Sequence, residues 1–172
     1  MSALKYVAAM SMFFCVCVHA QFLPNNNQLS VETVQRWMDS NRDLSPVVEM
    51  VDGMHASEED LKKFDLLSPV EQDKKISVFL QQKKIAETAT SIAVRHGWKS
   101  VGEYMRLSTK LGNAIAAYFL EEEIEKLSAE HKKQVLDKAD PAVKAVPAAD
   151  LAFVKANEKL LKEYIMAYGN SR

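Results

Sequence analysis

Helix start signals recur along most of this chain, and they constrain its fold more than any other feature of the sequence. Ser68 is followed by Pro69 and Glu71, which is the pattern of a serine N-cap, a proline at the first helical position and a glutamate that completes a capping box. Ser100 and Glu103 repeat the serine–glutamate spacing. These residue types satisfy backbone N–H groups that the first turn of a helix leaves without partners. The sequence therefore predicts helices that begin at these serines.

Apolar residues after the start signals recur at intervals of three and four, the spacing of one face of an α-helix. No stretch alternates apolar and polar residues over the length of a strand. The expected helices are 31–42, 45–51, 58–67, 69–95, 101–127, 129–137 and 147–168, with one helical turn in the connection at 139–150. We predict an all-α fold, an irregular bundle of about five to seven helices.

The two long helices that flank Gly97 are expected to form a central antiparallel hairpin, because only a few residues join them. Gly97 is placed to end the first of them in a left-handed conformation. In the second, Ser108, Gly112 and Ala116 recur every four residues and present small side chains on one face. Glycine inside a helix costs about 1 kcal/mol relative to alanine, so we expect close approach of the preceding helix at Gly112. The alternative is a loosely packed surface at this position.

The first 20 residues have the features of a secretory signal peptide. Lys5 supplies one positive charge, and residues 6–18 form an apolar run. This run is shorter than the roughly 20 residues that a membrane-spanning helix needs. We expect cleavage between Ala20 and Gln21, where small residues precede the bond. An uncleaved membrane anchor is the alternative.

Cleavage there would remove Cys15 and Cys17 together with the signal peptide. The mature chain would then have no cysteine, which excludes disulfides, thiol catalysis and thiolate metal sites. Residues 21–29 are polar and lack a period, so we expect a flexible leader. Residues 30–172 are expected to form a single helical domain.

The charge of the chain is close to balanced, with 22 basic and 23 acidic residues. Loss of Lys5 with the signal peptide leaves 21 basic residues, and hence a formal charge of −2. This balance disfavours nucleic acid or an anionic membrane surface as the main partner. Lysine pairs such as Lys74 and Lys75 alternate with acidic and amide residues, which favours a mixed surface over an anion-binding strip.

No residue pattern in the chain indicates catalysis. His55, His96 and His131 stand apart, and none has the Glu-x-x-His spacing of a di-iron site in a helical bundle. The chain has neither a Gly-x-Ser-x-Gly motif nor a phosphate-binding loop. We therefore assign no catalytic residue, no metal and no cofactor, and we disfavour an enzyme.

Methionine and aromatic side chains give a second possibility, an interhelical cavity for a small apolar ligand. Methionine adapts to irregular shapes and is common in such cavities. The ordinary interpretation is that these residues form the core. The residues concerned are Met50, Met54, Phe64, Phe79, Met105, Phe119, Phe153 and Met166.

The segment "RHGWKSVGEY", residues 95–104, places an imidazole and two aromatic rings around two glycines. We interpret it as a corner between two helices, over which Trp98 and Tyr104 pack. If the chain has a ligand-binding site, then His96, Trp98 and Tyr104 are its first candidates. Exposure of the Trp98 indole beside an open pocket would favour the ligand site.

The stretch "HGWKSVGEYMRLSTKLGNAIAAY", residues 96–118, resembles a pattern in small uncharacterised exported α-helical proteins of Gram-negative bacteria. These proteins share a signal peptide, an amphipathic first helix and a His-Gly-aromatic turn before a long helix. The resemblance implies a periplasmic location and an all-α fold. It implies no activity.

We therefore expect an exported, periplasmic protein whose role is binding or protein interaction. An envelope protein is one possible partner, and the surface would then carry an apolar groove or patch. The alternative is a carrier of a small apolar ligand, which would instead enclose a cavity between helices. After processing we expect no transmembrane anchor.

Overall fold

The structure, a computed structural model, describes residues 29–170, with side chains described as far as Met166. Within this part of the chain it contains nine helices and no strand, so the all-α bundle is confirmed, with more helices than expected. The signal peptide, the cleavage point between Ala20 and Gln21 and nearly all of the leader lie outside the described residues. The helices are α1 (Val31–Asp52), α2 (Glu58–Asp65), α3 (Pro69–Gln82), α4 (Ala86–Arg95), α5 (Val101–Glu125), α6 (Ala129–Lys138), α7 (Pro141–Lys144), α8 (Ala148–Ala156) and α9 (Glu158–Asn170).

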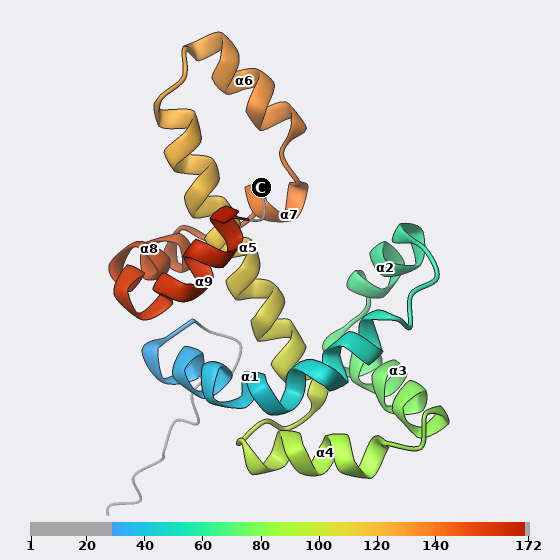
Figure 1. Ribbon diagram of the computed structural model, residues 1–172. Helices are drawn as coiled ribbons and strands as arrows, with labels where there is room; N and C mark the ends of the chain where they lie inside the picture. The colour runs from blue at the N-terminus through green and yellow to red at the C-terminus, as the bar shows by residue number, and fades with distance from the viewer. Residues whose placement is uncertain (1–28, 171–172) are drawn as a thin grey trace, which may run out of the picture.

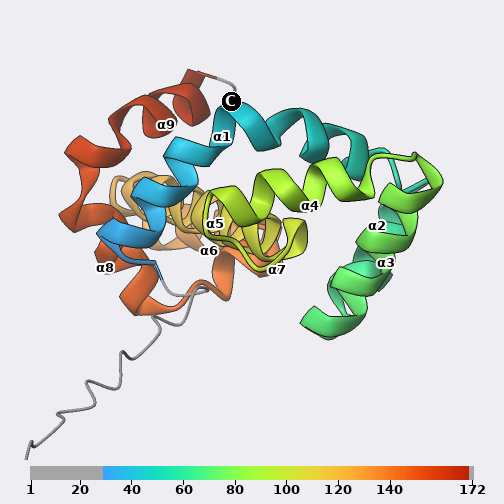
Figure 2. The same ribbon diagram turned by 90° about the horizontal axis from the view of Figure 1, so that it is seen from below.

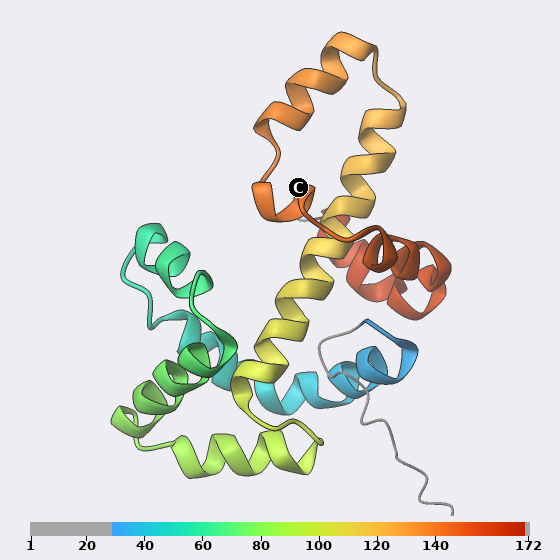
Figure 3. The ribbon, with the colours of Figure 1, turned by 180° about the vertical axis from the view of Figure 1, so that it is seen from behind.

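Helix α5 is the centre of the bundle. It contacts α1, α3 and α4, and all four helices that follow it in the chain (Figures 1 and 3). Leu107, Leu111, Ala114 and Ile115 recur at helical spacing along α5 and are each at most 4% exposed. Because neighbours on several sides cover this helix, the core forms around it.

Helix α1 runs without interruption through Pro46, where we expected two separate helices. Proline removes one backbone hydrogen bond and costs about 3 kcal/mol inside a helix. Leu44, Val47 and Val51, on both sides of Pro46, lie on one face of α1, and all three are buried. Burial of each such side chain contributes about 1.5–3 kcal/mol, so the buried face outweighs the proline.

The expected helix at 69–95 is divided into α3 and α4. Lys84 has a φ of 60°, in the left-handed region. The N–H of Lys84 donates to the carbonyl of Gln81 at 2.9 Å, and that of Ile85 donates to the carbonyl of Leu80 at 3.0 Å. This pair of bonds is a Schellman motif, which ends a helix and is usually built on glycine. The expectation failed because a lysine occupies the left-handed position.

Gly97 ends α4 with the same motif, as expected. Its φ is 78°, and the N–H of Trp98 donates to the carbonyl of Ala93 at 2.9 Å. However, α4 has only ten residues, and it lies across the N-terminal end of α5 in two perpendicular views (Figures 1 and 2). A central antiparallel hairpin of two long helices is therefore not confirmed.

The expected close contact at Gly112 is wrong. A Cβ built on Gly112 meets no atom within 4 Å, and the residue is exposed. The contact is missing because α4 crosses the N-terminal end of α5 and does not run along it (Figures 1 and 2).

The close approach occurs instead at Gly102, in the first turn of α5. A Cβ on this residue would lie 2.0 Å from Oδ1 of Asp73, which belongs to α3. The same carboxylate accepts hydrogen bonds from Arg106 at 2.7 Å and from the Ser100 hydroxyl at 3.1 Å. Glycine at position 102 thus lets one side chain of α3 bond to the start of α5.

Helix α2 is attached more weakly than its neighbours. Ser57 caps its N-terminus, and Phe64 is its only buried residue. The amide of Gln72 in α3 donates to the carbonyl of Phe64 at 3.2 Å. These two features hold α2 beside α3.

The C-terminal helix also divides where one helix was expected, at Asn157 between α8 and α9. The amide of Asn157 donates to the carbonyl of Phe153 at 2.8 Å and so satisfies an acceptor at the end of α8. The chain then turns, and the Tyr164 ring of α9 packs on Trp37 of α1, with ring centroids 4.8 Å apart.

Replacing Gly102 by alanine should lower the free energy of unfolding by about 1–3 kcal/mol, because the new methyl group must displace the Asp73 carboxylate. Gly112→Ala is the matched control in the same helix. With open space around it, alanine there should raise the free energy of unfolding by about 0.5–1 kcal/mol. Urea denaturation of both variants measures the difference. Equal effects at the two positions would contradict the close contact.

Candidate functional site

Trp98, one of the three residues singled out in the sequence, lies in the core with 1% of its surface exposed. Its indole N–H donates to the Ser40 hydroxyl at 2.8 Å, and that hydroxyl donates in turn to the carbonyl of Arg36. The Arg36 guanidinium stacks over the indole, 4.4 Å from its centroid. Both the N–H group and the ring face of Trp98 therefore contact other residues of the protein.

Tyr104 is also 1% exposed and packs against Trp98, with ring centroids 5.5 Å apart. Its hydroxyl donates to the side-chain oxygen of Asn41 at 2.8 Å. Burial, with a smaller contribution from the neighbouring Tyr164, raises the pKa of Tyr104 to about 12. The phenol therefore stays neutral and acts as a hydrogen-bond donor to α1.

His96 is the only one of the three that reaches the surface, with 20% of its side chain exposed. Its Nε2 lies 2.9 Å from Oδ2 of Asp43, and a guanidinium nitrogen of Arg95 lies 3.0 Å from the same oxygen. The hydrogen bond from His96, together with the charge of Arg95, lowers the pKa of Asp43 below its ordinary value of 3.8. This cluster ties the end of α4 to α1.

The structure thus brings His96, Trp98 and Tyr104 together, and each of the three makes a hydrogen bond to a side chain of α1. This arrangement favours a corner that holds α1, α4 and α5 together. An open hollow of about 620 Å³ lies beside His96, and it is lined mainly by charged side chains of α1 and α4, with Val31 as the one aliphatic residue.

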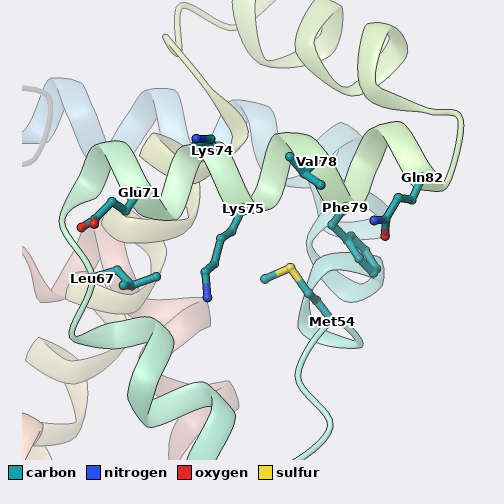
Figure 4. A pocket seen from close by; sticks show the side chains of 8 residues that line it. All are labelled: Met54, Leu67, Glu71, Lys74, Lys75, Val78, Phe79 and Gln82. Atoms are coloured by element: carbon teal, nitrogen blue, oxygen red, sulfur yellow. The ribbon is translucent and has the colours of Figure 1, made fainter.

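An open groove of about 450 Å³ lies between the end of α1, the end of α2 and the outer face of α3 (Figure 4). Lys75 extends across it, with Leu67 on one side and Met54 on the other (Figure 4). Phe79 lies beside Met54. The lining is mostly apolar and consists of Met54, Leu67, Glu71, Lys74, Lys75, Val78, Phe79 and Gln82.

The helical period of α3 explains how the groove forms. Gln72, Ile76 and Leu80 recur every four residues and are buried toward the bundle. The groove residues of α3 lie on the remaining face, which no other helix covers. Met54 follows α1 and Leu67 follows α2, so two chain turns supply the walls.

The charges at the groove are mainly positive. Glu71 accepts hydrogen bonds from the backbone N–H of Ser68 at 2.9 Å and from its hydroxyl at 2.6 Å, which lowers the pKa of Glu71. Its carboxylate thus completes the expected capping box of α3. Lys74 and Lys75 are exposed, and neither takes part in an ion pair within 4 Å among the described residues.

Exposed apolar side chains are concentrated in the segment from α1 to α3, and one of them, Val78, lines the groove. Of the nine large apolar residues that are exposed in the described part of the chain, five fall between positions 50 and 78. Val70, in the first turn of α3, is 78% exposed. Scattered exposed apolar residues are ordinary, whereas a concentration of them marks an interaction surface. The five are Met50, Leu61, Leu66, Val70 and Val78.

A larger cleft of about 690 Å³ lies over α5, between α2 and α3 on one side and α7 with the start of α8 on the other. Arg106 and Lys110 form part of its floor. Arg106 pairs with Asp73 at 2.7 Å, and Lys110 lies 3.2 Å from a carboxylate oxygen of the buried Asp150 without the angle of a hydrogen bond. These floor charges are neutralised inside the protein, so the groove remains the stronger candidate.

The described residues bring no three potential metal ligands together. His55 packs on the Phe64 ring at 4.8 Å, and Nδ1 of His131 lies 2.9 Å from the Ser128 hydroxyl. No described helix is long and apolar enough to cross a bilayer. No protein-family model matches the chain, and neither a curated protein nor a solved structure matches it.

Some residues of the groove can be recognised from the sequence, but their proximity in the fold cannot. Met54 and Phe79 were named as apolar candidates, and Lys74 and Lys75 as a basic pair. Leu67 and Val78 were not singled out. The available signal was the second face of α3, on which Val78 lies one turn beyond Lys74 and Lys75.

Replacing Asp43 by asparagine should lower stability at neutral pH. The folded-state pKa of Asp43 is depressed, so its contribution is present above 3.8 and is lost as the pH falls through the folded-state pKa. The stability difference between wild type and Asp43→Asn should therefore vanish in acid. Urea denaturation from neutral pH to below 3.8 measures it. Asp39→Asn, whose partner Gln35 is uncharged, should show a smaller difference. A pH-independent difference for Asp43→Asn would contradict the ion cluster.

Proposed function

We propose that this protein is exported to the periplasm and acts there by binding another protein through the groove beside α3. The export part rests on the amino-terminal sequence, with one positive charge at Lys5, an apolar run at 6–18 and small residues before Gln21. The binding part rests on the groove and on the exposed apolar side chains of the segment from α1 to α3, which forms it.

The observation that carries the proposal is the position of the exposed apolar surface. Leu66 and Val70 are 87% and 78% exposed, on either side of the link between α2 and α3. Val78 is 45% exposed in the groove itself. Contact with water is unfavourable for such side chains by about 25 cal/mol per Å² of apolar area, and a partner would remove that contact.

A carrier of a small apolar ligand is the second candidate. A carrier surrounds its ligand, and pockets for small molecules typically bury about 70–90% of the ligand surface. The groove at α3 is open to solvent along one side, where a free apolar molecule would remain in contact with water (Figure 4). This shape supports a protein partner over a carried ligand.

If the export proposal is right, the protein recovered from the periplasmic fraction begins at Gln21. Amino-terminal sequencing or intact-mass measurement of the native protein tests this. Recovery in the cytoplasm with Met1 retained would contradict both the location and the cleavage point.

A photo-crosslinking amino acid at position 78 should give a discrete adduct in cells that make the protein, because Val78 faces the groove. The same group at position 94 is the matched control, since Val94 is a similarly exposed valine on α4. Position 94 should give no adduct or only diffuse products. Identical products from both positions, or none from position 78, would contradict the proposed binding surface.

A further inference from the structure

The groove is elongated along α3 and is not an enclosed cavity. Its residues on α3 include 71, 74, 75, 78 and 82, a set that repeats on one helical face. From 71 to 82 the helix rises about 16 Å, which is three turns at 1.5 Å per residue. An occupant of matching shape is therefore elongated and lies beside α3.

The groove covers its occupant on one side only. Met54 and Leu67 form walls at the ends of α1 and α2, and the remaining side is open (Figure 4). An occupant that fits such a surface is apolar toward the groove and polar toward solvent. An amphipathic helix has this division, and its apolar residues at i, i+3, i+4 and i+7 match a groove of about three turns.

The charges on the rim of the groove determine which charge the occupant should carry beside its apolar residues. Lys74 and Lys75 lie on the groove face of α3, and Lys83 lies just beyond it, 5.3 Å from the Phe79 ring. Glu71 is the one acidic residue in the lining. Its carboxylate is bonded to Ser68 and interacts with Lys75, and the two lysines exceed it by one positive charge. The rim therefore complements a partner with Asp and Glu beside its apolar stripe.

We infer that the groove formed by Met54, Leu67, Val78 and Phe79 binds an amphipathic α-helix of a partner protein, with acidic side chains of that helix meeting Lys74 and Lys75. This inference rests on the proposed function and specifies the chemistry of the partner. A helix is the expected occupant because the groove is three helical turns long and covers its occupant on one side only. The helix is expected to be acidic because the rim of the groove is cationic.

Selection from a phage-displayed library of 16-residue peptides on the full mature chain tests the inference without assuming a partner sequence. Peptides selected on the wild type should be amphipathic, with apolar residues at helical spacing and an excess of Asp and Glu. Val78→Asp should weaken their binding by about tenfold or more, because it places a carboxylate in the apolar lining. Val94→Asp is the matched control and should bind them as the wild type does.

The double variant Lys74→Glu/Lys75→Glu tests the charge directly. Selection on the double variant should favour basic amphipathic peptides. Acidic peptides from the first selection should bind the double variant about tenfold more weakly than the wild type, or more weakly still. Thermal melting of every variant checks that it is folded, and all substituted positions are exposed, so folding should be retained.

Several outcomes would overturn the inference. These are selection of basic or non-amphipathic peptides on the wild type, no enrichment at all, or binding that Val78→Asp leaves unchanged. Self-association of the wild type that Val78→Asp abolishes would assign the groove to a second copy of the chain. Displacement of selected peptides by micromolar laurate would assign it to an anionic amphiphile.

The two proposals can fail separately. A discrete cross-link from position 78 without enrichment of acidic peptides would keep the binding surface and reject the acidic helix. Enrichment of acidic peptides without a cross-link from position 78 would show that the groove can bind such helices, and it would reject the groove as the binding surface used in cells.

Discussion

The approach of the Asp73 carboxylate to the backbone of Gly102 determines how α3 lies against α5. Ser100 and Arg106 donate to the same carboxylate, so the first turns of α5 hold one side chain of α3 from several directions. With one face of α3 fixed toward the bundle, its opposite face must lie outward beside the ends of α1 and α2. The candidate groove is a direct result of this geometry, since it consists of that outward face and those two chain ends.

The helix starts of this fold could be predicted from sequence, and several helix ends could not. Ser68 and Ser100 cap helices through bonds to residues three positions on, so the signal is local. The division at Lys84 depends on a backbone conformation that lysine seldom adopts, and the continuity through Pro46 depends on which side chains the bundle buries. Both are decided by tertiary packing, which outweighs local preference.

The same division between local and distant information applies to the candidate site. The corner at Gly97 was recognisable because its glycine, caps and aromatic residues lie within ten positions of one another. The groove draws Met54, Leu67 and Val78 from three separate elements, and each is an ordinary apolar residue in its own segment. In the folded chain Val78 is exposed, and Met54 and Leu67 are half-buried at the edge of the core, which distinguishes all three from fully buried residues.

Helix α2 has a consequence for how the groove works. One buried side chain, Phe64, and one bond from Gln72 attach it to the bundle. A segment with so little buried apolar area undergoes local unfolding at a free energy well below that of the whole domain. Leu67, at the end of this segment, forms one wall of the groove. An occupant that contacts Leu67 therefore binds the closed form of α2 in preference to the open one, and the affinity of the groove is thermodynamically linked to the ordering of that helix.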